Sequence, residues 1–319
     1  MKNTITIYAC GGSGVNIGQL VEAKFASLAA DIVPHSDIIV YYIDTSESNV
    51  RDKKVTNLYL FDGLDGSGGL RVSNKDEIAD YVPDILAKFA PGDLSIVINS
   101  TSGGSGSVIG PMIASKLLER EKLVISVAIM SSESKNHLIN TVDVLETLEG
   151  ISVHNERVLP VILCDNNQSN EDSVNNTVFA SVYSLSVLFS GGLLRLDSAD
   201  LDNWINFNKV TSHPIGAVLL DIVSNDTTLE KNDVICSVAS IVKNNNEVYK
   251  DFVEYKTTGI FNSGDKNSLN NIHFTLIDGP IQRAHKRHKE MLEEKISISC
   301  SRPKRTSIAS TTTARGFKF

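Results

Sequence analysis

The sequence lacks any apolar run that approaches the roughly 18 residues needed for a membrane-spanning helix. Its beginning, Met1-Lys2-Asn3, passes directly into a strand-like segment, so we expect no signal peptide. CxxC pairs are also missing, which argues against a zinc or disulfide framework. We therefore expect a soluble, cytoplasmic protein with free thiols. The four isolated cysteines are Cys10, Cys164, Cys236 and Cys300.

Strong compositional bias is absent as well. Apolar residues make up 41% and charged residues 21% of the 319-residue chain, which excludes a fibrous or wholly disordered protein. The net charge is −8, but residues 283–319 hold ten Lys or Arg against three Glu, a local +7 that leaves −15 for the body. We do not expect so acidic a body to bind nucleic acid directly. The basic tail is suited to dock on the acidic surface of another copy of the chain.

Short β-branched runs alternate with helix-like stretches over the first 170 residues. Five runs read as strands, at 4–9, 38–43, 94–98, 123–130 and 158–163. Strands that alternate with helices form parallel sheets that are covered on both faces. The sequence therefore predicts an α/β fold built on a mostly parallel sheet.

The second half of the chain is patterned differently. Residues 172–189 have helix length and apolar residues on most faces, which indicates a buried central helix. Strand-like runs follow at 215–223, 234–242, 252–255 and 273–277, and Pro280 starts a charged helix expected to reach about Ile296. The predicted division is a nucleotide-binding domain (1–171), a central helix (172–194), a smaller mixed α/β domain (195–279), and a C-terminal helix with a basic tail (280–319).

Two glycine-rich turns each follow a predicted strand and open a predicted helix. They are Cys10-Gly11-Gly12-Ser13-Gly14 and Ser102-Gly103-Gly104-Ser105-Gly106-Ser107. A helix N-terminus presents unpaired N–H groups, and glycine lets a phosphate approach this backbone closely. Two such turns on neighbouring strands can hold a phosphate chain from both sides. The P-loop signature GxxxxGK[ST] is absent, which excludes that class.

The first turn by itself leaves other interpretations open. Gly12 and Gly14, with Asp44 at the end of the next strand, also fit a dinucleotide fold in which Asp44 binds a ribose. An NAD-dependent oxidoreductase is therefore an alternative, and a tight turn without a ligand is another. Retention of NAD by the purified protein would support the oxidoreductase, and retention of a different nucleotide in its place would argue against it.

The second turn resembles the tubulin/FtsZ signature GGGTGSG or GGGTGTG, with Ser105 in place of Thr and Val108 in place of the last Gly. The resemblance continues motif by motif over residues 4–205. Segments 103–111 and 195–204 look most like the phage-encoded tubulins. The resemblance implies a Rossmann-like tubulin domain and a GTPase that polymerises into filaments. Such relatives position phage DNA or the replication compartment in infected bacteria.

The same resemblance implies a set of GTP contacts. Gly68 and Gly69 are placed like a third phosphate loop, Glu133 like a ribose contact, and Asn166 and Asn175 like the guanine-reading residues. Asn suits that task because its amide both donates and accepts, although by pattern alone these two are a turn residue and an exposed helix residue. Glu171 replaces the aromatic residue that stacks on the base. The implied contacts are Gly11, Gly12, Ser13, Asn16, Asp44, Thr45, Gly68, Gly69, Gly103, Gly104, Ser105, Gly106, Ser107, Glu133, Asn166 and Asn175.

Two acids, Asp197 and Asp200, follow the central helix. Acids at this spacing commonly cap a helix. By resemblance they belong to a loop that enters the next subunit's nucleotide site, where carboxylates position or deprotonate the attacking water. The resemblance thus implies a homopolymer with shared sites and GTP/GDP with Mg²⁺ as cofactors, the metal being held by phosphates and water. A module that holds a nucleotide without hydrolysing it is a further alternative, and turnover that rises steeply with protein concentration would argue against it.

Overall fold

The structure is a computed structural model. It describes residues 3–28, 35–50, 55–64, 66–71, 75–166, 171–224, 234–243, 249, 252–261 and 270–301. No helix within these ranges is long and apolar enough to cross a membrane. The basic tail predicted beyond residue 301 lies outside the described residues.

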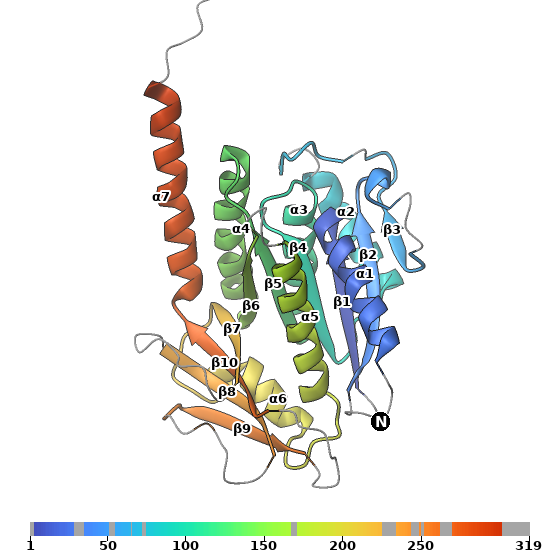
Figure 1. The fold of residues 1–319 in the computed structure, drawn as a ribbon, viewed down its shortest axis with the longest axis vertical. Coiled ribbons are helices and arrows are strands. Elements are labelled where there is room, and N and C mark those ends of the chain that lie inside the picture. Colours follow the sequence, from blue (N-terminus) through green and yellow to red (C-terminus); the bar gives the residue numbers. More distant parts are fainter. Residues whose placement is uncertain are drawn as a thin grey trace, which may run out of the picture.

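The described strands form one sheet in the order β3-β2-β1-β4-β5-β6-β7-β10-β8-β9 (Figure 1). Only the pairings of β10 with β7 and with β8 are antiparallel. The predicted fold class, α/β with a mostly parallel sheet, is confirmed. The strands are β1 (Thr4–Cys10), β2 (Asp37–Asp44), β3 (Leu58–Leu60), β4 (Leu94–Ser100), β5 (Val124–Met130), β6 (Leu159–Asp165), β7 (Ala217–Ser224), β8 (Val234–Val242), β9 (Tyr255–Ile260) and β10 (Ile272–Asp278).

Helices cover both faces of this sheet. One face carries α1 and α5, which contact each other, and the other carries a row in which α2, α3, α4 and α7 are successive neighbours (Figure 1). Within β1, Ile5 and Ile7 join the core beneath α1 and α5, whereas Tyr8 and Cys10 join the core beneath α2, α3 and α4. The helices are α1 (Gly11–Ser27), α2 (Lys75–Lys88), α3 (Gly106–Glu119), α4 (Lys135–His154), α5 (Glu171–Leu188), α6 (Ser198–Ile205) and α7 (Pro280–Ser301).

The strand order reverses between β1 and β4. β1 pairs with β2 on one side and with β4 on the other, both in parallel. In open α/β sheets, ligands bind in the crevice outside the carboxyl ends of the strands at such a switch point. β1 ends at Cys10 and β4 at Ser100, so the two glycine-rich turns leave the sheet side by side.

Several elements differ from the sequence prediction. The run 252–255 is not a strand: Phe252 is 94% exposed, and β9 begins only at Tyr255, where the ladder with β8 starts. β3 was not predicted, α6 was indicated only by the helix-capping spacing of its two acids, and α7 continues beyond Ile296 to Ser301. β7 pairs with β6, Leu159 lying opposite Ala217, so the C-terminal strands extend the same sheet.

Candidate nucleotide-binding site

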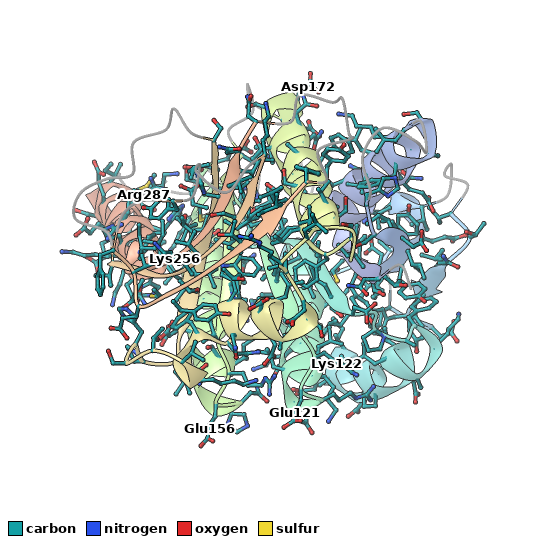
Figure 2. All side chains as sticks on the ribbon, turned by 90° about the horizontal axis from the view of Figure 1, so that it is seen from below. Glu121, Lys122, Glu156, Asp172, Lys256 and Arg287 are labelled. Carbon is teal, nitrogen blue, oxygen red and sulfur yellow. The ribbon has the colours of Figure 1, made fainter. Side chains whose placement is uncertain are left out.

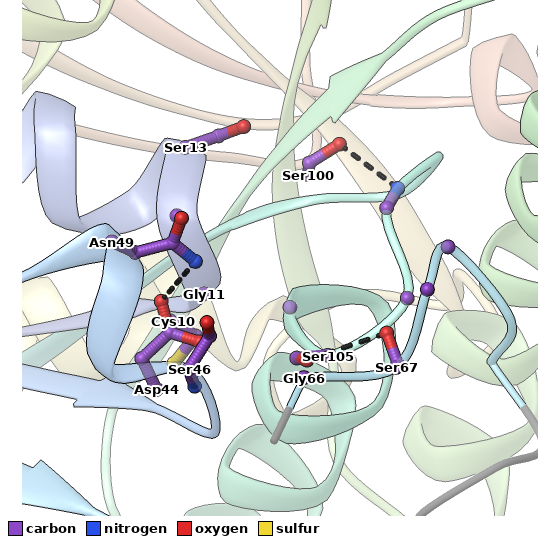
Figure 3. Close-up of a pocket in the computed structure, with 16 residues that line it drawn as sticks. Cys10, Gly11, Ser13, Asp44, Ser46, Asn49, Gly66, Ser67, Ser100 and Ser105 are labelled. Atoms are coloured by element: carbon purple, nitrogen blue, oxygen red, sulfur yellow. Dashed lines mark hydrogen bonds between the residues drawn. The ribbon is translucent and has the colours of Figure 1, made fainter.

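Three glycine-rich loops enclose a cavity of about 250 Å³ at the carboxyl ends of β1 and β4 (Figure 3). We call residues 10–14 the first loop, 100–107 the second loop and 66–69 the third loop. The loop after β2 completes the wall. The lining residues are Cys10, Gly11, Gly12, Ser13, Asp44, Ser46, Asn49, Gly66, Ser67, Gly68, Gly69, Ser100, Gly103, Gly104, Ser105 and Gly106.

The first and second loops touch backbone to backbone. Gly11 has a φ of +70°, and a Cβ on it would lie 2.7 Å from the Cα of Gly106. A Cβ on Gly106 would in turn lie 2.8 Å from the carbonyl oxygen of Cys10. Glycine at both positions removes these clashes and tolerates the left-handed backbone of Gly11. The two helix starts are thereby held at the wall of one cavity.

The helices that open at this cavity have no side-chain cap. Neither the side chain of Cys10, before α1, nor that of Ser105, before α3, accepts a hydrogen bond from a backbone N–H of its helix. By contrast, the Ser134 side chain accepts the N–H of His137 at the start of α4. The first N–H groups of a helix need acceptors, and the helix dipole favours anions there. Two uncapped N-termini facing one cavity suit the oxygens of a phosphate chain.

Hydroxyl groups line the junction of the loops. The Thr45 and Ser105 hydroxyls lie 2.5 Å apart, and the Ser105 hydroxyl donates to that of Ser67 at 3.4 Å (Figure 3). The Ser100 hydroxyl accepts the N–H of Gly103 at 3.3 Å. Because hydroxyls both donate and accept, this row can bind phosphate oxygens or a water molecule.

Asp44 is fully buried beneath the loop that follows β2. Its Oδ1 accepts the backbone N–H groups of Thr45 and Ser46 at 2.7 and 3.2 Å, and its Oδ2 accepts the side-chain amide of Asn49 at 2.8 Å (Figure 3). Burial, and secondarily the charge of Asp44, raise the pKa of the Cys10 thiol. Asp44 therefore fixes its own loop, an arrangement that does not support the ribose contact of the oxidoreductase alternative.

Asn140, on α4, joins the second and third loops from behind. Its amide nitrogen donates to the carbonyl oxygens of Gly69, Ser102 and Gly103 at 3.1, 2.9 and 3.2 Å. The side chain is only 5% exposed, so these bonds have little competition from water. Sequence reasoning missed this residue, because nothing in the pattern of α4 marks it.

Ten of the predicted contact residues line the cavity and six do not. The ten are Gly11, Gly12, Ser13, Asp44, Gly68, Gly69, Gly103, Gly104, Ser105 and Gly106. The six outside its lining are Asn16, Thr45, Ser107, Glu133, Asn166 and Asn175. Thr45 bonds to a lining residue, and the Ser107 hydroxyl bonds back to the carbonyl of Gly104. Sequence reasoning missed Ser46 and Asn49, although polar residues directly after a parallel strand are a usable signal.

The residues expected to contact the nucleoside lie beyond this cavity. Glu133 is exposed in the loop after β5, and Asn166 directly follows β6. The backbone N–H of Asn166 donates to the carbonyl of Met130 at 2.8 Å, which brings the two loops together. The Asn166 Oδ1 atom is buried and has no hydrogen-bond partner among the described residues. Asn175 is half-buried on α5, which is bonded to α1 through Lys24.

The two acids form a capping box at the start of α6. Oδ1 of Asp197 accepts the N–H groups of Ala199 and Asp200, and Oδ2 of Asp200 accepts the N–H of Asp197 at 3.1 Å. Asp197 is exposed and Asp200 half-buried. α6 lies at the end of the molecule opposite the cavity (Figure 1), and Figure 2 views the protein from that end. The two carboxylates therefore do not reach the cavity of their own subunit.

The cavity offers one carboxylate, that of Asp44. Throughout the described ranges, no group of three or more His, Cys, Asp or Glu side chains is placed to hold a metal ion. Because the cavity fits a phosphate chain, an accompanying Mg²⁺ would take its ligands chiefly from phosphates and water.

Solved structures share this architecture over nearly the whole chain. The protofilament of TubZ from bacteriophage PhiKZ matches with a TM-score of 0.85 and 28% identity, covering 99% of each chain. The GDP complex of the phage tubulin PhuZ matches with a TM-score of 0.85 and 24% identity over the same share of both chains. The fold is therefore that of these phage tubulin structures.

The chain also has relatives that are similar in sequence. A phage tubulin-like protein of Pseudomonas phage PhiPA3 is 34% identical over 209 residues, 64% of this chain and 61% of that protein. The phage tubulin-like protein of Pseudomonas phage phiKZ is 28% identical over 302 residues, 90% of this chain and 88% of that protein. No protein-family model matches the chain. The chain is similar in sequence and in fold to these phage tubulin-like proteins.

Proposed function

We propose that this protein binds GTP in the glycine-lined cavity, hydrolyses it, and polymerises head to tail into filaments. The observation that carries the proposal is the meeting of two uncapped helix N-termini, α1 and α3, at one cavity. Such a site takes a polyphosphate rather than a neutral ligand. The relatives support the choice of nucleotide and assembly, since PhuZ is solved with GDP and PhiKZ TubZ as a protofilament.

Guanine and ribose would extend from the cavity toward the ends of β5 and β6. There Glu133 would take the ribose and Asn166 and Asn175 would read the base, while Asn16 would belong to the first phosphate loop. The buried Oδ1 of Asn166 supports this role, because guanine offers the N–H donors that this acceptor lacks among the described residues. We propose Mg²⁺ as the companion ion, held by phosphates and water.

The acids of one subunit would complete the site of the next. α6 and the cavity occupy opposite ends of the molecule (Figure 1), so head-to-tail stacking would bring Asp197 and Asp200 over a neighbour's phosphates. There the carboxylates would position or deprotonate the attacking water. Turnover then requires assembly, and its rate would rise more than linearly with protein concentration.

Asparagine variants of the acids test this mechanism. Asn also caps helices, so Asp197→Asn and Asp200→Asn keep the start of α6 while removing the charge. We expect both to bind GTP normally and to assemble, while turnover falls on the order of a hundredfold or more. Asp202→Asn is the matched control, because Asp202 lies on the same helix and pairs with Lys209. Wild-type turnover in Asp200→Asn would refute the assigned role.

Two finer assignments complete the proposal. We propose that residues 1–171 act as the GTP-binding unit, 172–194 as the central helix, 195–279 as a smaller activation unit, and 280–319 as the segment that docks on a neighbour. We also propose that the filaments position phage DNA or the replication compartment in an infected bacterium, as the family resemblance implies. Electron microscopy of the pure protein with and without GTP tests the assembly on which both rest.

A further inference from the structure

The C-terminal helix α7 is built onto the side of the molecule that would hold the nucleoside. It packs against α4, and Ile281, Ala284 and His288 form its buried stripe. That stripe continues through half-buried Met291 to Lys295 at the helical spacing of three and four residues. Lys295 therefore lies on the face of α7 that packs against the protein. An apolar residue would be sufficient there if packing were its only role.

Two cationic side chains of α7 bond to neighbouring loops of the sheet. The Lys295 ammonium donates to the backbone carbonyl of Ser132, in the loop after β5. The Arg287 guanidinium, on α7 at the left of Figure 2, pairs with the Asp165 carboxylate at 3.2 Å, at the end of β6. These contacts cross 163 and 122 positions of sequence, so they are formed only in the folded chain.

Each contact lies one residue away from a proposed nucleoside contact. Ser132 precedes Glu133, and Asp165 precedes Asn166. The two loops are also tied to each other, because Met130 and Asp165 are ladder partners and the Asn166 N–H donates to the Met130 carbonyl. A shift of α7 would therefore act on both loops together.

We propose that Arg287 and Lys295 are positioning residues that set the protein's preference for its nucleoside. Lys295 fixes the peptide that carries Glu133, and Arg287 fixes the turn that presents the Asn166 Oδ1. The inference rests on the proposed GTP site, and it adds a specificity device outside the cavity. By thermodynamic reciprocity, a bound nucleoside also stabilises α7 in its place.

The competing explanation is plain electrostatics, since each substitution removes a positive charge from an acidic body. Loss of a distant charge would weaken a bare polyphosphate at least as much as a nucleotide, because the polyphosphate has no contact besides its charge. Loss of positioning weakens only ligands that carry the nucleoside. Inorganic tripolyphosphate therefore separates the two explanations.

The test measures dissociation constants below the assembly concentration for GTP, ATP and inorganic tripolyphosphate. Both partners of the Arg287–Asp165 pair are about half exposed, so we expect Arg287→Gln to weaken GTP binding only about two- to fivefold. Tripolyphosphate binding should stay unchanged and the GTP-to-ATP ratio should fall. Lys286→Gln is the matched control, because it removes an equal charge from the same helix and its recorded partner is Glu290.

A double-mutant cycle locates the effect. If Arg287 acts through Asp165, then Arg287→Gln adds nothing in an Asp165→Asn background. Lys295→Met keeps the length of the side chain and removes its hydrogen-bond donor. Because Lys295 is proposed to position Glu133, the ribose contact, we expect this variant to reduce the difference in affinity between GTP and 2′-deoxy-GTP. Thermal unfolding of each variant checks that the fold is intact.

The possible outcomes are distinct. Equal GTP binding by wild type, Arg287→Gln and Lys295→Met overturns the positioning role, and so does a parallel loss of tripolyphosphate binding. A wild-type protein that binds GTP no better than ATP overturns the proposed function itself. A selective loss of nucleoside-dependent affinity in both variants, but not in Lys286→Gln, supports the inference.

Discussion

Replacing Asn140 by Asp would separate the second and third loops of the cavity. The substitution keeps the shape of the side chain but removes the amide that donates to the carbonyls of Gly69, Ser102 and Gly103. A carboxylate would instead present an oxygen to three carbonyl oxygens in a site that is 5% exposed. Both effects act on the loops rather than on the core of the sheet.

The cost follows from the number of bonds lost. A buried hydrogen bond contributes about 1 kcal/mol net, and a buried carbonyl left without a donor costs about 1–3 kcal/mol. With several acceptors on one amide, the total is on the order of 2–3 kcal/mol. Since about 1.4 kcal/mol is a factor of ten, we expect GTP affinity to fall about five- to tenfold if half of this cost is borne by the bound state.

Two measurements check the prediction, namely GTP affinity by a fluorescent analogue and unfolding free energy by urea. Asn155→Asp is the control. Asn155 lies at the other end of α4, where its amide donates to the carbonyl of Ile151 at 2.7 Å and touches no glycine loop. It should lower stability without lowering affinity. Unchanged GTP affinity in Asn140→Asp would refute the role assigned to this residue.

Three further outcomes are expected. Gly11→Ala should abolish GTP binding, because Gly11 has a φ of +70° and an added Cβ would clash with the backbone of Gly106. Gly150→Ala should bind GTP normally, because an added Cβ there has nothing within 4 Å. Equilibrium dialysis compares the two variants. Burial lowers the pKa of His273 below its ordinary 6.5, so the unfolded chain takes up a proton at a higher pH than the folded chain does. The free energy of unfolding should therefore fall as the pH drops below 6.5, and it should fall less steeply in His273→Gln. Urea midpoints measured at two pH values would show this difference. Deleting residues 302–319 should raise the critical concentration for assembly, and light scattering that finds it unchanged would count against tail docking.

Much of the fold could be read from the sequence because parallel strands are buried on both faces. β1, β4 and β5 are continuous apolar runs that need no distant information to be recognised. The glycine turns after β1 and β4 were equally legible, since each combines a strand end with a helix start. β9 was misplaced because a strand at the edge of a sheet is defined by its ladder, and Phe252 lies outside that ladder.

The two acids of α6 show that one sequence pattern can indicate both a structural and a catalytic role. The spacing of Asp197 and Asp200 indicated both a helix cap and a catalytic pair, and the structure shows the cap. The same carboxylates remain at the surface of α6, where a neighbouring subunit could use them, so the capping geometry does not compete with the proposed role.

The sequence by itself determined the α/β class, the glycine turns and the tubulin-like resemblance, because each depends on residues that are close together in the chain. Only the tertiary structure decided that Gly11 and Gly106 touch, that Asn140 joins two loops, and that α7 reaches the loops after β5 and β6. These contacts join residues far apart in the chain, and their acceptors are mostly backbone carbonyls, which every residue type supplies. Local sequence therefore carries no signal for them, and the packing of the sheet and its helices fixes them.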